Sequence, residues 1–129
     1  MPSILQNHHV LAVHDLRGSA AFFRDVLGFR VVDEPPGWVF LARDRCMMML
    51  GECADALPPA SLGDHSYFGY LLVDDAEAWY AEVKPRGGEA VGPLADKPWG
   101  MREFHVRTPE GHRLMVGQVL APAAAGGSR

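Results

Sequence analysis

The sequence has few cysteines and no long apolar stretch. Only Cys46 and Cys53 are cysteines among the 129 residues, and they form no Cys-x-x-Cys pair. Neither a disulfide framework nor a structural zinc site is therefore expected. No apolar run approaches the roughly 20 residues that span a bilayer, and the first residues lack the pattern of a secretion signal. We expect reduced thiols, no membrane partner and a cytoplasmic location.

Basic residues are also too few for a nucleic-acid partner. Lys and Arg number 12 against 16 Asp and Glu, a formal net charge of −4, whereas nucleic-acid binding needs a basic face. Mild acidity favours a cationic ligand instead, by electrostatic steering. The 48% hydrophobic and 22% charged content is that of an ordinary globular protein, and the length suits one domain of roughly 100–150 residues.

The periodicity of the first half predicts a strand, a helix and three further strands. Asp15 is the expected N-cap of the helix, which runs through Leu27 and ends at Gly28. Prolines and a charged turn separate the strands that follow. The predicted strands are residues 7–13, 29–32, 38–42 and 46–50.

The second half repeats this order. Asp74-x-x-Glu77 has the form of a capping box and predicts the start of a helix that Pro85 and Gly87-Gly88 end. The predicted strands are residues 67–73, 89–91, 103–107 and 113–118. Val13 matches Val73 and Met49 matches Met115 when the halves are superposed, so the chain is predicted to contain an internal repeat.

The repeat predicts an α+β fold of two tandem βαβββ modules with one helix per module. The modules span about residues 4–53 and 66–119, within a single domain of residues 1–120. Residues 121–129 are rich in Ala, Gly and Ser and are expected to form a flexible tail.

Two stretches resemble a known superfamily. Residues 8–16 (HHVLAVHDL) with 21–29 (AFFRDVLGF) resemble the opening strand and helix of glyoxalase and bleomycin-resistance modules. Residues 98–104 (PWGMREF) and 107–112 (RTPEGH) are similar to the bleomycin-resistance branch of this vicinal-oxygen-chelate superfamily, which also contains dioxygenases. The resemblance covers about residues 4–119 and implies two half-barrels, each an open, curved mixed sheet whose concave side holds a ligand or metal.

Metal-using members of the superfamily place one ligand on the first and one on the last strand of each module. Those positions correspond here to His8 and Phe68 and to Met49 and Met115. Thioether is a soft ligand and phenylalanine is none, so His8 is the only residual candidate for a hard divalent metal. The replacement of these ligands therefore predicts no metal site apart from the residual candidate His8, no cofactor and no catalytic residue.

Strand alternation predicts what these positions do instead. If His8 faces the concavity, then Val10 faces it too, while Leu11 faces the helix. Of the three consecutive methionines, Met48 is the expected core residue. Trp99 lies in a Pro-Trp-Gly loop that suits ligand stacking. The predicted ligand-binding residues are Trp38, Phe40, Met47, Met49, Phe68, Tyr70, Trp99 and Met115.

Charged residues near these positions have simpler interpretations. Arg102 and Glu103 are expected to pair structurally across strands. Loop carboxylates could attract a cationic drug, but such groups are usually solvated. These carboxylates are Asp33, Glu34, Asp64 and Asp96.

The leading hypothesis is non-catalytic binding and sequestration of a bulky aromatic small molecule, for which the net charge favours a cation. Methionine and aromatic side chains suit such a ligand, and stoichiometric sequestration needs no nucleophile. The resemblance also implies a homodimer. One alternative is a metal-dependent lyase or dioxygenase of the glyoxalase type that uses His8; another is a dimeric accessory module with a vestigial cleft.

Overall fold

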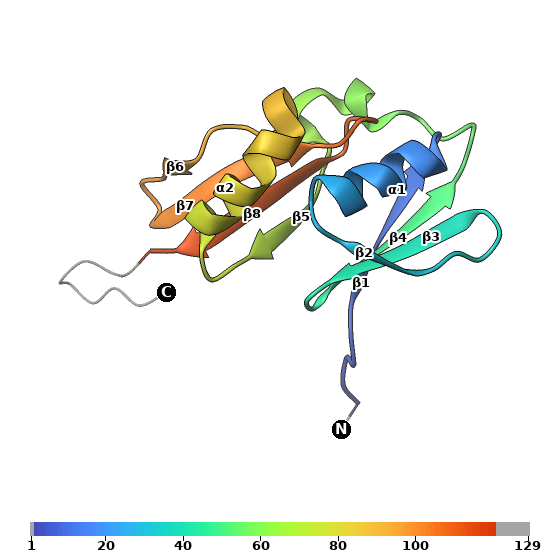
Figure 1. The fold of residues 1–129 in the computed structure, drawn as a ribbon, viewed down its shortest axis with the longest axis horizontal. Coiled ribbons are helices and arrows are strands. Elements are labelled where there is room, and N and C mark those ends of the chain that lie inside the picture. Colours follow the sequence, from blue (N-terminus) through green and yellow to red (C-terminus); the bar gives the residue numbers. More distant parts are fainter. Residues whose placement is uncertain (1, 121–129) are drawn as a thin grey trace. The chain divides into compact units, whose positions relative to one another are not determined.

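The computed structural model describes residues 2–120, without the side chains of Asp64 and His65. Over these residues the chain forms two four-stranded sheets and two α-helices (Figure 1). The predicted flexible tail and the predicted role of Asp64 lie outside the described residues. None of the helices in the described range is long and apolar enough to cross a membrane.

The first sheet has the strand order β1-β4-β3-β2, and the second has the matching order β5-β8-β7-β6. In each, the first and last strands of the module pair in parallel and the other pairs are antiparallel. The predicted α+β fold of two βαβββ modules is thereby confirmed. The elements are β1 (His8–Val13), α1 (Leu16–Asp25), β2 (Arg30–Asp33), β3 (Trp38–Arg43), β4 (Cys46–Glu52), η1 (Pro59–His65), β5 (Tyr67–Leu72), α2 (Ala76–Gly87), η2 (Gly88–Ala90), β6 (Ala95–Asp96), β7 (Met101–Arg107) and β8 (Arg113–Val119).

The chain divides into two compact units. The first comprises Met1–Ser66 and Thr108–His112, and the second comprises Tyr67–Arg107 and Arg113–Arg129. The turn between β7 and β8 therefore belongs to the first unit, although its flanking strands belong to the second. The predicted single domain of residues 1–120 stays a prediction.

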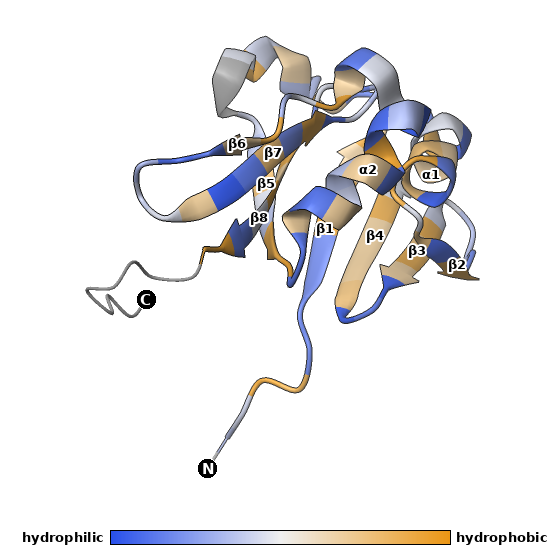
Figure 2. Cartoon of the chain, turned by 60° about the vertical axis from the view of Figure 1, so that its left-hand side comes forward, coloured by the Kyte–Doolittle hydropathy of each residue, from blue (hydrophilic) through white to orange (hydrophobic). Residues whose placement is uncertain are grey.

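Each helix covers one face of its own sheet, since α1 contacts β3 and β4, and α2 contacts β7 and β8. Alternation along the strands sends apolar side chains into these layers. Figure 2 shows most of β4 coloured as hydrophobic, and the burial of its residues alternates between this core and the opposite face from Met47 to Leu50. The core includes Leu11, Val13, Phe23, Leu27, Leu41, Met48 and Leu50 in the first unit and Val83, Phe104, Val106, Leu114 and Val116 in the second.

The helix starts show one confirmed and one wrong prediction. Asp15 caps α1 and accepts a hydrogen bond of 3.0 Å from the backbone N–H of Gly18. Asp74 was predicted to open the second helix, but Asp75 is the N-cap and accepts a bond of 3.0 Å from Ala78 N–H. Two adjacent aspartates make the capping position ambiguous in sequence, and the helix start at Ala76 decides it.

Two predictions after this helix start are also wrong. Pro85 lies inside α2 and does not end it, whereas the predicted end at Gly87 and Gly88 is confirmed. Proline has a φ that suits a helix, but it lacks the N–H donor and its ring crowds the carbonyl four residues earlier. Residues 89–91 form no strand, because a 3₁₀ turn occupies Gly88–Ala90 and Val91 makes only an isolated bridge to Val106. The outer strand is β6 instead. The apolar character at Val91 reflects burial rather than strand pairing.

Candidate functional site

Each sheet has an open face, by which we mean the face turned away from its helix. On the first open face, Met49 is the register partner of Val10 on β1 and of Phe40 on β3. Val10 is 60% exposed, whereas Met48, which points the other way, is 0% exposed. The prediction that Met48 is the core residue among the three methionines is confirmed.

An aromatic pair lies beside these methionines. Trp38 and Phe40 share the first open face, and their ring centroids are 6.0 Å apart with the planes at 62°. The Trp38 ring covers Gly51, where an added Cβ would come within 2.8 Å of the indole. Glycine is thus required at this point of β4 for the indole to lie against the strand.

The second open face is built on the same plan. Tyr70 and His105 are both register partners of Met115, from β5 and β7 respectively. Phe68 is half-buried and falls at an irregularity in β5, where the register shifts between Tyr67 and Gly69. Strand alternation therefore does not define its face.

The strongest polar feature of the second open face is a carboxylate between two aromatic side chains. The Tyr70 hydroxyl donates a hydrogen bond of 2.7 Å to Glu103 Oε2, and Trp99 Nε1 donates one of 3.2 Å to the same oxygen. Glu103 is 5% exposed, whereas Tyr70 and Trp99 are 44% and 63% exposed. We call these three residues the Glu103 cluster.

Two glycines allow this cluster to form. Gly117 lies on β8 opposite Glu103, and an added Cβ there would overlap the Tyr70 hydroxyl. Gly100 has φ of 83° and donates a hydrogen bond of 3.0 Å to the carbonyl of Lys97, so the loop turns before β7. This turn places the Trp99 indole within hydrogen-bond distance of the Glu103 carboxylate. Lys97 Nζ lies 5.9 Å from the centre of the Trp99 ring.

Arg102 and Glu103 were each expected to form a structural pair across strands, and the expected ion pair is confirmed for Arg102 alone. Arg102 pairs across strands with Asp96 at 2.6 Å, and this hydrogen bond lowers the pKa of Asp96. Glu103 instead bonds to two aromatic groups. The available sequence signal was an acid at the same strand parity as His105, whose register partner is Met115.

The residues present do not fit the hard divalent metal that many superfamily members use. His8 is exposed, and its Nε2 donates a hydrogen bond of 2.8 Å to Gln6. Within residues 2–120, apart from the two undescribed side chains, no three His, Cys, Asp or Glu side chains gather as a metal site. Phe68, Met49 and Met115 offer no hard ligand.

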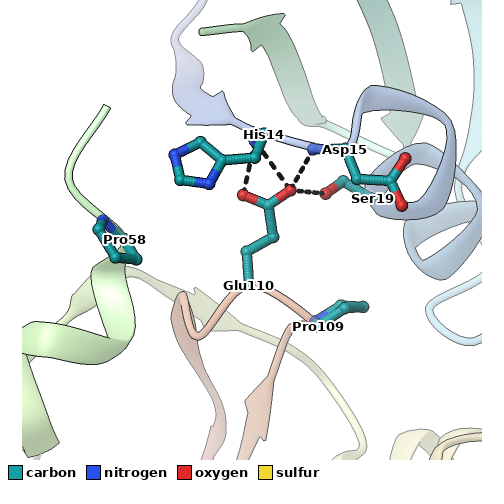
Figure 3. A pocket seen from close by; sticks show the side chains of 6 residues that line it. All are labelled: His14, Asp15, Ser19, Pro58, Pro109 and Glu110. Carbon is teal, nitrogen blue, oxygen red and sulfur yellow. Dashed lines mark hydrogen bonds between the residues drawn. The ribbon is translucent and has the colours of Figure 1, made fainter. Parts of the chain in front are cut away.

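A pocket of about 310 Å³ lies elsewhere, at the start of α1 (Figure 3). The Glu110 carboxylate accepts bonds from the N–H groups of His14 and Asp15 at 2.7 and 2.6 Å and from the Ser19 hydroxyl at 3.3 Å. Pro58 and Pro109 complete the lining. None of the eight predicted ligand-binding residues lines this pocket, and its carboxylate is engaged in holding the helix start.

The eight predicted ligand-binding residues are divided equally between the two units. Trp38, Phe40, Met47 and Met49 lie in the first, and Phe68, Tyr70, Trp99 and Met115 lie in the second. That all eight bind ligand stays a prediction.

These features define a protein of two βαβββ modules whose open faces carry aromatic and methionine side chains. The family model of the Glyoxalase/Bleomycin resistance protein/Dioxygenase superfamily matches residues 5–116, and the chain belongs to this family. The resemblance inferred from sequence is confirmed. No match was found among curated proteins.

Solved structures with similar folds include several drug-binding proteins. The bleomycin resistance determinant encoded on transposon Tn5 is 25% identical, with 88% of this chain and 97% of that chain covered and a TM-score of 0.73. A bleomycin-binding protein from Streptomyces verticillus in complex with copper(II)-bleomycin is 21% identical, with coverage of 95% and 100% and a TM-score of 0.70. TnmS3, an antibiotic-binding protein from Streptomyces sp. CB03234, is 23% identical, with coverage of 92% and 99% and a TM-score of 0.69.

Proposed function

We propose that this protein binds and sequesters a bulky aromatic small molecule without transforming it. The observation that carries the proposal is the chemistry of the open faces, which carry exposed aromatic rings beside methionines. Met49 and Met115 stand at two of the positions that, by the resemblance, hold metal ligands in metal-using relatives. Trp38, Tyr70 and Trp99 all retain exposed surface. Exposed rings bind planar ligands by stacking, and methionine adapts to irregular shapes.

The drug-binding relatives support the same proposal. Bleomycin-binding and antibiotic-binding proteins share this fold along nearly the whole chain. Sequestration also needs only shape and contact, because occupying a compound stoichiometrically requires neither a nucleophile nor a general base. Bleomycin is therefore the first compound to test, and related aromatic antibiotics follow.

The experiment is a tryptophan fluorescence titration with bleomycin and with copper(II)-bleomycin. We expect saturable quenching at a stoichiometric ratio, reduced in Trp38→Phe and Trp99→Phe. Trp79→Phe is the matched control, because Trp79 lies on α2 rather than on an open face. Mass spectrometry of the recovered ligand should find it unchanged. Absence of saturable binding to bleomycin and to a panel of aromatic antibiotics would contradict the proposal, as would a chemically altered product.

Metal analysis separates this proposal from the enzymatic alternative. Stoichiometric nickel, zinc, manganese or iron in the purified protein, lost in His8→Ala, would support a metal-dependent lyase or dioxygenase. We further propose that the protein acts as a homodimer. Sedimentation equilibrium should give twice the chain mass, and a monomer that still binds ligand would overturn the dimer.

A further inference from the structure

We propose that Glu103 receives a positively charged nitrogen of the ligand, so that the protein selects aromatic cations. This inference rests on the proposed function and deepens it by naming the chemical class of the ligand. The site is the Glu103 cluster, where the aromatic rings would hold the planar part and the carboxylate an attached ammonium or guanidinium group.

The hydrogen bonds of Glu103 leave one oxygen free. Both neutral donors, Tyr70 O–H and Trp99 Nε1–H, bond to Oε2. Within the part of the chain that the structure describes, Oε1 accepts no hydrogen bond and the carboxylate forms no ion pair with Lys, Arg or His. A carboxylate that is 5% exposed thus has two neutral hydrogen-bond partners and no ion-pair partner.

The free oxygen remains open to a ligand. Oε1 accepts no hydrogen bond from the described residues and is not enclosed, so it keeps contact with water. A charge-assisted hydrogen bond to a cation is about twice as strong as the neutral bonds that Oε2 already accepts. Binding of a cationic nitrogen at Oε1 would supply the missing charge. The gain is specific to cations, because a neutral ligand leaves the carboxylate as it is.

The aromatic rings suit the same class of ligand. Tyr70 and Trp99 are 44% and 63% exposed while both hold the carboxylate. Lys97 Nζ already lies 5.9 Å from the centre of the Trp99 ring, so the face of this indole accommodates a cation. Aromatic faces attract cations and also stack on planar groups. The net charge of −4 adds long-range attraction for a cation.

The test compares two dyes of the same shape and different charge by isothermal titration calorimetry. 9-Aminoacridine is a cation at neutral pH and acridine is neutral. We expect the unaltered protein to bind 9-aminoacridine at least about tenfold more tightly, a difference of about 1.4 kcal/mol. In Glu103→Gln the amide oxygen still accepts from Tyr70 and Trp99, but the charge is gone, so the preference should disappear while acridine binding stays unchanged.

Glu89→Gln is the matched control, because it removes the same charge from an exposed position in the same unit; it should keep the preference. Equal affinity of the unaltered protein for both dyes would overturn the inference and leave the proposed function standing. Equal weakening of both dyes by Glu103→Gln would also overturn it and assign Glu103 the positioning of Tyr70 and Trp99 alone. Binding of neither dye overturns the inference too, and the bleomycin titration then decides the proposed function separately. If Glu103→Gln does not fold, equal affinity of the unaltered protein for both dyes still overturns the inference.

Discussion

The hydroxyl of Tyr70 reaches over Gly117 to donate its 2.7 Å hydrogen bond to Glu103. Tyr70 lies on β5 and Glu103 on β7, with β8 between them. The bond is possible because Gly117 has no Cβ in the path of the ring. Gly51, the repeat equivalent of Gly117 on β4, lies under Trp38. Glycine at the same strand position lets an aromatic side chain lie against each sheet.

Gly117→Ala should break the bond between Tyr70 and Glu103. The new methyl group would occupy the position of the hydroxyl, and the displaced Tyr70 would leave a buried carboxylate with one donor fewer. We expect the free energy of unfolding to fall by about 1–3 kcal/mol, measured by urea denaturation. Tyr70→Phe removes the same bond without steric conflict. The double variant should therefore cost less than the sum of the two single variants, and strict additivity would contradict this coupling.

Met48→Ala and Met49→Ala form a matched pair of adjacent truncations. Met48 is 0% exposed, so its truncation should leave a cavity and cost about 2–5 kcal/mol of unfolding free energy. Met49 lies on the first open face, and its truncation should cost less than about 1 kcal/mol while weakening bleomycin binding. Equal stability losses, or a binding defect confined to Met48→Ala, would refute the assignment of faces.

Glu110→Ala should loosen the start of α1. The carboxylate accepts bonds from two backbone N–H groups and from the Ser19 hydroxyl, and their loss should cost about 1–3 kcal/mol. Hydrogen exchange at the amides of His14 and Asp15 should accelerate. Glu89→Ala serves as the control, because Glu89 is exposed and should stay within about 0.5 kcal/mol of the unaltered protein. Unchanged exchange at both amides would contradict this role of Glu110.

His112 should make stability depend on pH. Burial lowers the pKa of its imidazole below the ordinary value of 6.5, so the folded protein keeps the ring neutral where the unfolded chain takes up a proton. The contribution is present above the unfolded pKa and is lost as pH falls through 6.5 toward the folded value. The stability advantage of the unaltered protein over His112→Gln should shrink between about pH 8 and pH 5 in urea denaturation. A difference that does not vary with pH would refute the buried, neutral imidazole.

Much of the fold could be predicted because it depends on local patterns. Alternation placed Leu11 in the core and Val10 on the open face, and the cap at Asp15 marked the first helix. Prediction failed where neighbouring residues offered equivalent local chemistry. Either Asp74 or Asp75 can cap a helix, and a buried Val91 resembles a strand residue whether or not it pairs.

The Glu103 cluster shows where prediction from sequence reached its limit. Tyr70 and Trp99 were each selected by residue type and position, but their common partner, Glu103, was expected only to form a structural pair across strands. Their meeting depends on the strand order β5-β8-β7, on the turn at Gly100 and on the missing Cβ of Gly117. These are relations between distant segments, which no local pattern encodes.

The sequence by itself determined the repeat, the two modules, the family and the replacement of hard metal ligands by methionine and phenylalanine, because residue type and spacing carry that information directly. Only the tertiary structure decided that a nearly buried carboxylate lies between two exposed aromatic rings with one oxygen free. Hydrogen bonds between side chains depend on distances of about 3 Å, and only the folded sheet brings Tyr70, Trp99 and Glu103 within that range.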